Sequence, residues 1–349
     1  MPPMEIPDLD IRINDVALPP EAAADLRSVT VQEDLGAMSM FGFELSNWDD
    51  RLLRYSWSEA SLFALGAEVK IALGYVDELQ HVMLGEISSL EPQFASDGST
   101  LTVRGYDLRN RLARGRKTRT FAQMTDSAIA SQLAAEAELG AQVTDTETKR
   151  EHVLQSNVSD WEFLQQRARL IGFEVYVRDK DLHFGPPRLV GSSVATLRVG
   201  AELSELALRL SVQGQVEQVA VRGWDVKQKQ VIVERAKVGE ETTMTGEVSG
   251  PRRAQVVFGT SSAVVVDVPL ESSEEAGAMA RGRLDDTALD YLRGDASGDG
   301  RPDVRAGSVV TIEGAGERFS GEYYVTSVTH TLSIEQGYQT SFSVRRNAA

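Results

Sequence analysis

The chain has 349 residues, with 52 acidic and 36 basic side chains, a net charge of -16 and no cysteine. This length exceeds the usual size of one core, so we expect two to four domains or subdomains. The lack of cysteine excludes disulfides, thiolate nucleophiles and cysteine-ligated zinc or iron–sulfur sites. The acidic balance argues against general nucleic-acid binding, which needs clustered Lys and Arg.

Apolar runs are too short to cross a bilayer, and the N-terminus "MPPMEIPDLDIRIND" has neither the basic nor the apolar region of a secretory signal. We therefore expect a cytoplasmic protein with no membrane insertion.

Alternation of apolar and polar residues predicts β-strands in the first third of the chain. Breaks at Gly, Asp and Ser separate the strands. The predicted strands are "AEVKIALGYV", "HVMLGEISSLEPQF" and "STLTVRGYDL".

A basic cluster, "RNRLARGRKTR", follows these strands and stands out in an acidic chain. One interpretation is a solvated face that balances acidic neighbours. The other is a contact patch for an acidic partner or a second copy. We predict that Arg114, Arg116, Lys117 and Arg119 lie at a subunit or partner interface and pair with carboxylates there.

Two helices are predicted in the middle of the chain. The first, "DSAIASQLAAEAELG", has Asp126 as candidate N-cap and Gly140 as candidate C-cap. The second begins with a capping box formed by Ser159 and Glu162 and ends at Gly172. A hairpin, "FEVYVRD" and "DLHFG", follows.

The next segment predicts further strands and then a third helix from about Ser273 to Tyr291, rich in Ala and Glu. The predicted strands are "VEQVAVRGWDV", "QVIVERAKV", "AQVVFG" and "AVVVDV".

The C-terminus predicts a hairpin with a turn at Glu335-Gln336-Gly337. Two sets of same-parity residues should face a core, namely Val328, His330, Leu332 and Ile334, and then Tyr338, Thr340, Phe342 and Val344. His330 is therefore expected to be packed rather than catalytic, because no nucleophile or partner carboxylate lies at a motif spacing.

An internal echo indicates duplication. Gly66, Gly85 and Gly98 precede strands in the same order as Gly307, Gly321 and Gly337. Two related β-modules would then flank a helix-containing middle.

The chain contains no nucleotide-binding glycine motif, HExxH or GxSxG. We predict no catalytic residues, cofactor or metal site. "GDASGDGRPD" resembles the start of an EF-hand loop, but Ala306 occupies the position of the bidentate carboxylate. A Gly/Asp loop is the simpler interpretation, with calcium as the open alternative.

The segment "RAGSVVTIEGAGERFSGEYYVTSVTHTLSIEQGYQTSFSVRRN" resembles the C-terminal part of the phage late control D family. "SNVSDWEFLQQRARLIGFEVYVRDKDLHFG" and "LGEISSLEPQFASDGSTLTVRGYDLRNRL" are also similar to it. The residues that match its C-terminal pattern are Phe319, Gly321, Tyr323, Val325, Val328, His330, Gly337, Tyr338, Thr340 and Phe342.

The resemblance implies a baseplate hub of a contractile tail or injection system, related to the hub portion of type VI valine-glycine repeat proteins. It implies a mainly β fold with two tube-protein-like β-barrel domains, 1–120 and 195–349, around a helix-containing middle, 121–194. A homotrimer would bind the inner tube protein, a separate trimeric spike and other baseplate components. The alternatives are a tail-associated peptidoglycan or polysaccharide hydrolase and a carbohydrate-binding β-protein.

Overall fold

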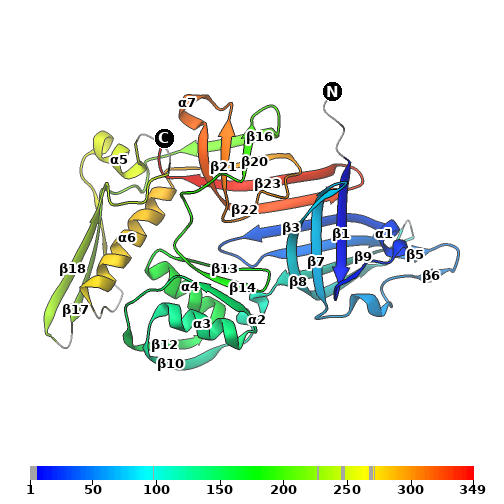
Figure 1. Ribbon diagram of the computed structural model, residues 1–349, viewed down its shortest axis with the longest axis horizontal. Helices are drawn as coiled ribbons and strands as arrows, with labels where there is room; N and C mark the ends of the chain where they lie inside the picture. Colours follow the sequence, from blue (N-terminus) through cyan, green and yellow to red (C-terminus); the bar gives the residue numbers. More distant parts are fainter. Residues whose placement is uncertain (1–5, 97, 226–227, 245–247, 267–269, 271) are drawn as a thin grey trace.

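The computed structural model describes residues 6–96, 98–225, 228–244, 248–266, 270 and 272–349. A 13-stranded sheet runs through both ends of the chain, and the helical middle lies beneath it (Figure 1). The predicted mainly β fold with a helix-containing middle is confirmed. No helix among the described residues is long and apolar enough to span a membrane.

The first module is a curled sheet in the spatial order β3-β4-β9-β8-β7-β1. Its core contains buried aliphatic and aromatic side chains from all six strands. The strands are β1 (Pro7–Ile13), β3 (Leu26–Asp34), β4 (Met40–Ser46), β7 (Glu68–Tyr75), β8 (Glu78–Gln93) and β9 (Thr100–Asp107). The smaller elements are β2 (Val16–Ala17), α1 (Pro20–Asp25), β5 (Trp48–Asp49), β6 (Arg54–Tyr55) and η1 (Ser61–Phe63).

The second module has the order β16-β20-β23-β22-β21-β15. When the six strands of each module are numbered in chain order, their spatial order in both sheets is second, third, sixth, fifth, fourth, first. The predicted repetition of strand order is therefore confirmed. One pairing differs, because β1 is antiparallel to β7 whereas β15 is parallel to β21. The elements are β15 (Ala195–Arg198), β16 (Leu203–Leu210), β20 (Leu292–Asp299), β21 (Val309–Glu313), α7 (Gly316–Phe319), β22 (Gly321–Ser333) and β23 (Gly337–Arg346).

The turn before the fourth strand is the same in both modules. Gly66 has φ of 84° and Gly307 has φ of 83°, a region that glycine enters without steric cost. Their N–H groups donate to the fifth strand, to Ile87 O and Val325 O, each at 2.8 Å. Matching turns and matching hydrogen bonds fix the register between the modules.

The predicted equivalence of Gly85 and Gly321 is wrong by two residues. Val69 pairs with Gly85, and the equivalent Val310 pairs with Tyr323. The hydrogen-bonded ladder sets the register of a strand, and a glycine within it need not recur.

The C-terminal hairpin forms as predicted, with Gly337 at φ 70° in its turn. Val328 and His330 are buried, as are the four inward residues of β23. Ile334 is an exception at 80% exposure, because it lies beyond the end of β22.

The middle region packs two main helices against a three-stranded sheet, β11-β14-β13. The capping box of Ser159 and Glu162 is confirmed. For the preceding helix, the N-cap is Thr125 rather than Asp126, and Gly140 begins a strand. The elements are α2 (Arg109–Ala113), β10 (Lys117–Met124), α3 (Asp126–Glu136), β11 (Gly140–Val143), β12 (Arg150–Val158), α4 (Asp160–Leu170), β13 (Glu174–Arg178) and β14 (Asp181–Gly185).

An insertion between β16 and β20 has a core of its own, formed where α6 packs on a three-stranded sheet. The predicted third helix is confirmed as α6. "AQVVFG" belongs to a helix rather than a strand, because Ser249 caps it and Pro251 occupies its first turn. The end of "AVVVDV" lies outside the described residues. The elements are β17 (Gln218–Asp225), β18 (Gln230–Lys237), α5 (Gly250–Phe258), β19 (Ser262–Val265) and α6 (Ser273–Leu289).

Candidate assembly site

The two modules are joined edge to edge by an antiparallel ladder between β3 and β22, which we call the seam. It pairs Ser28–Asp34 with Ser327–Ser333. The second strand of one module thus meets the fifth strand of the other, and a continuous sheet crosses the boundary (Figure 1).

A loop of the second module, residues 300–308, lies across the seam on the first module. Arg305 binds Glu33 with Nε at 2.7 Å from Oε1, and donates to the carbonyl of His81 at 2.9 Å. Burial alone would raise the pKa of Glu33, but the Arg305 guanidinium holds it below its usual value. Tyr75 donates its hydroxyl to Gly300 O at 3.0 Å.

His330 lies within the seam, paired along the backbone with Val31 and Thr340. Its ring is fully buried, and Nδ1 is 3.1 Å from Thr340 Oγ1 and 3.0 Å from the Tyr338 hydroxyl. Burial lowers the pKa of His330 to about 4, so the ring is neutral at pH 7. The expectation that His330 packs in a core is confirmed.

Two strand edges equivalent to the seam pair with nothing in the part of the chain that the structure describes. One is the outer edge of β16 after Leu203, which pairs only with β20, whereas Leu203 itself makes an isolated bridge to Val199. The other is the second half of β8, residues 88–93, which pairs only with β9. Such edges are available for pairing with another chain. The sequence analysis missed β16, although the leucines at 206, 208 and 210 alternate as a strand requires.

The basic cluster divides into buried and exposed members. Arg109 is buried against Asp107 at 2.5 Å, with its guanidinium over the ring of Trp161. Lys117 and Arg119 both reach Asp160, at 2.5 and 2.8 Å.

Arg116 and Arg119 find further partners within the same chain. Arg119 also binds Glu136 at 2.7 Å, and Arg116 donates to Asn157 O at 2.8 Å. Arg114 is exposed and makes no ion pair with any residue that the structure describes. Contact of this face with a partner stays a prediction.

The predicted Gly/Asp loop is wrong for residues 294–299, which form a strand, whereas residues 300–303 do lie in a loop. Residues 292–299 form β20, paired on both sides, and the Ser343 hydroxyl donates to Asp295 at 2.7 Å. Asp303 is bound by Arg301 at 2.6 Å. Within the described ranges, no group of three or more His, Asp or Glu side chains could hold a metal ion.

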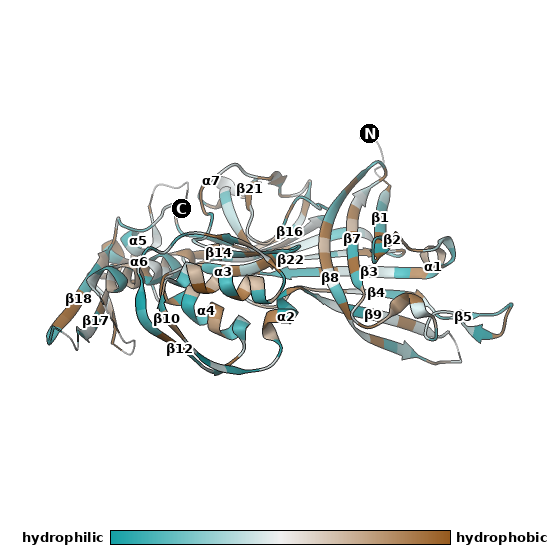
Figure 2. Cartoon of the chain, turned by 60° about the horizontal axis from the view of Figure 1, so that its bottom comes forward, coloured by the Kyte–Doolittle hydropathy of each residue, from teal (hydrophilic) through white to brown (hydrophobic). Residues whose placement is uncertain are grey.

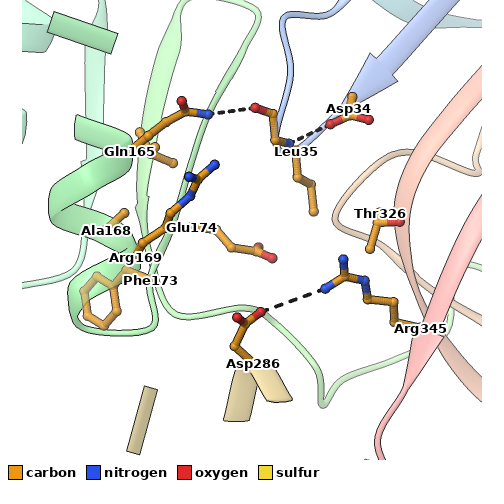
Figure 3. A pocket seen from close by; sticks show the side chains of 12 residues that line it. Asp34, Leu35, Gln165, Ala168, Arg169, Phe173, Glu174, Asp286, Thr326 and Arg345 are labelled. Atoms are coloured by element: carbon orange, nitrogen blue, oxygen red, sulfur yellow. Dashed lines mark hydrogen bonds and ion pairs between the residues drawn. The ribbon is translucent and has the colours of Figure 1, made fainter. Parts of the chain in front are cut away.

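A cavity of about 330 Å³ lies where the middle region, the β3–β4 loop and the second module meet (Figure 3). Glu174 points into it and accepts a hydrogen bond from the Tyr324 hydroxyl at 2.5 Å. Burial raises the pKa of Glu174 to about 7, although Tyr324 and Arg345 oppose the rise. Arg345 faces Asp286 at 3.9 Å across the opening.

Solved structures define the class of fold, which is that of phage tail proteins. A 43 kDa tail protein of prophage MuSo2 from Shewanella oneidensis has a TM-score of 0.72 at 13% identity, over 97% of this chain and 98% of that one. A tail protein from Neisseria meningitidis has a TM-score of 0.69 at 15% identity, over 98% and 97%.

A type VI secretion component of E. coli, which itself resembles bacteriophage T4 tail proteins, has a TM-score of 0.63 at 13% identity, over 97% and 77%. The chain belongs to the family described as the Alg8 N-terminal domain, whose model matches residues 5–334. That family is not the late control D family, so membership of the latter is not confirmed. No curated protein matches the chain.

Proposed function

We propose that this chain is the structural baseplate hub of a phage tail or contractile injection system. Three copies would form a ring that joins a sixfold inner tube to a threefold spike. On this proposal, the chain is not an enzyme and takes no cofactor. Its partners are the tube protein, a separate spike and other baseplate components of an assembled particle. The late control D resemblance and the tail-protein fold support this role.

The repeated seam edges are the observation that carries the proposal. Within one chain, a second strand pairs with a fifth strand at the seam. The remaining second strand, β16, and the remaining fifth strand, β8, have open edges in the described structure. If β8 of one copy pairs with β16 of the next, every module boundary becomes equivalent and the sheet closes into a ring.

The internal repeat gives the register of this contact. The bulge after Leu26 in β3 recurs after Leu203 in β16, and the bulge at Ser88 in β8 recurs at Thr326 in β22. In the seam, Thr329 pairs with Gln32 and Thr331 with Thr30. The equivalent pairs between β8 and β16 are Glu91 with Arg209 and Gln93 with Ala207. The first pair joins opposite charges, which favours this register.

Pro92 affects one bond of the proposed ladder. It would face Leu208, and it has no N–H to donate, so that ladder lacks one hydrogen bond. Proline is tolerated in edge strands for this reason and also hinders pairing with unrelated chains.

A disulfide between Gln93→Cys and Ala207→Cys is expected to link neighbouring copies into covalent trimers. Side chains opposite one another across a ladder lie about 4.5–5.5 Å apart at Cβ, close to what a disulfide needs. The chain has no native cysteine, so every disulfide formed is the designed one. Non-reducing electrophoresis and native mass spectrometry measure the products.

The equivalent intrachain pair, Thr30→Cys with Thr331→Cys, is the positive control, because those residues face each other in the seam. Gln93→Cys with Arg209→Cys is the displaced control, since a diagonal pair lies too far apart. Monomers from the test pair, or rings of another size, would contradict the proposed ring.

Reversal of Arg114 and Arg116 to Glu is expected to reduce assembly into particles about tenfold or more, with the chain still folded, if this face contacts an acidic partner. Both side chains are exposed, whereas Arg119 is held by Glu136 and Asp160. Particle counts by electron microscopy and circular dichroism of the isolated chain are the measurements. Arg252→Glu with Arg253→Glu, on α5, is the charge-matched control. Normal particles from the test variant would assign the cluster to a solvated surface.

A further inference from the structure

An aromatic hairpin, residues 47–57 with β5 and β6, projects from the end of the first module (Figures 1 and 2). Trp48 stacks edge-on against Tyr55 at 5.2 Å, and Tyr55 against Phe94 at 4.6 Å. These rings are 40%, 37% and 57% exposed, and Leu53 at the tip is 73% exposed. Clustered exposed apolar side chains of this kind mark an interaction surface.

Hydrogen bonds hold the base of the hairpin. Asn47 is fully buried, and its side-chain oxygen accepts hydrogen bonds from Trp57 N at 2.9 Å and Ser58 N at 3.1 Å. Asp49 Oδ1 accepts from the backbone of Arg51 at 2.9 Å. These bonds order the backbone that carries the apolar side chains, and such ordering before binding lowers its entropic cost.

The second module shows what a loop at this position does. The hairpin belongs to the connection from third to fourth strand, residues 47–67, and the same connection in the second module is the loop 300–308. That loop crosses the seam and packs on the adjoining module through Arg305 and Gly300. The hairpin is the longer counterpart of this loop, and in the part of the chain that the structure describes no module lies beside it (Figure 1).

We propose that the aromatic hairpin binds the second module of the next copy of this chain. This rests on the proposed ring. Its contact surface is the turn between the fourth and fifth strands of that module, which contains α7, together with the end of β16 at Leu210. In the intrachain seam, the equivalent strands of the first module contribute Tyr75, His81 and Glu33 to the contact.

The chemistry of that surface fits an apolar contact with a charged rim. Phe319 is half-buried against the core of the second module, and Leu210 packs at its margin. Glu317 and Arg318 are exposed beside them. Phe94 directly follows the open end of β8, so it lies where the strand contact and the hairpin contact would join.

Photocrosslinking identifies directly which molecule the aromatic hairpin binds. With p-benzoylphenylalanine in place of Leu53 in the full chain, we expect crosslinks to residues 203–210 or 313–322 of another copy, mapped by mass spectrometry. The same probe at Val231, an exposed residue of the insertion, is the matched control and should not reach those residues. Crosslinks only within the same chain, or to a tube or spike subunit in the particle, would overturn the proposal.

A second measurement separates this proposal from the ring itself. Trp48→Ser with Leu53→Ser is expected to lower the yield of the Gln93–Ala207 disulfide trimer about tenfold, because anchors of this kind carry much of the energy of an interface. If the Trp48→Ser, Leu53→Ser variant gives as much disulfide trimer as before, and the probe at Leu53 forms no crosslink to a second copy, the hairpin contact is contradicted while the ring is not. If the Gln93→Cys, Ala207→Cys chain with its native hairpin forms no disulfide trimer, both the ring and the hairpin contact are contradicted.

Discussion

Gly282→Ala is expected to lower the free energy of unfolding by about 3 kcal/mol, near the upper end for overpacking a close contact. A Cβ at position 282 would lie 2.4 Å from Gly172 N and 2.7 Å from the carbonyl carbon of Ile171. Both atoms belong to the backbone, so neither can rotate away. The contact joins α6 of the insertion to the end of α4, and its loss should release the middle region from α6.

Gly277→Ala in the same helix is the matched control. A Cβ there meets no atom within 4 Å, so alanine should stabilise the chain by about 0.5–1 kcal/mol through its better helix propensity. Urea denaturation and limited proteolysis of the middle region measure both variants. Equal unfolding free energies of the two variants would contradict the prediction, because they would show that α6 and the end of α4 can move apart without loss of stability.

Glu174→Gln is expected to gain about 3 kcal/mol in stability, relative to the unmodified chain, between pH 4.5 and pH 8. The pKa of Glu174 is raised by burial to about 7 from an unfolded value near 4.5, so the folded state binds the proton more tightly. The stabilising contribution of the protonated carboxyl is present below pH 4.5 and is lost as pH rises through 7. Glutamine keeps the neutral form at every pH.

His330 produces the opposite slope. The pKa of His330 is lowered to about 4, so its contribution is present above pH 6.5 and is lost as pH falls through 4. The two effects oppose each other between pH 4.5 and 6.5, which should flatten the profile of the unmodified chain. His330→Gln therefore complements Glu174→Gln. For each variant, the difference in unfolding free energy from the unmodified chain is plotted against pH, and the two plots should slope in opposite directions. A flat difference profile for Glu174→Gln would place its pKa in the folded chain near the ordinary value.

Much of the architecture could be predicted from local pattern. The C-terminal hairpin, the capping box of Ser159 and the third helix follow from alternation, a side-chain cap and periodicity, which act within a few residues. The repeated strand order was also visible, because turns at Gly66 and Gly307 need the same positive φ. "AQVVFG" was misassigned, since its composition favours a strand while the cap and proline ahead of it begin a helix.

The assembly site depended on tertiary structure. Whether β3 meets β22, and which edges stay open, is decided by pairing between residues about 300 apart in the chain, on which local periodicity carries no information. The partners of Arg119 were equally hidden, because Glu136 and Asp160 approach it only when α3, α4 and β10 pack together. The sequence by itself determined the strands, the turns and their repetition, whereas the seam, its open counterparts and the ion pairs arose from long-range packing.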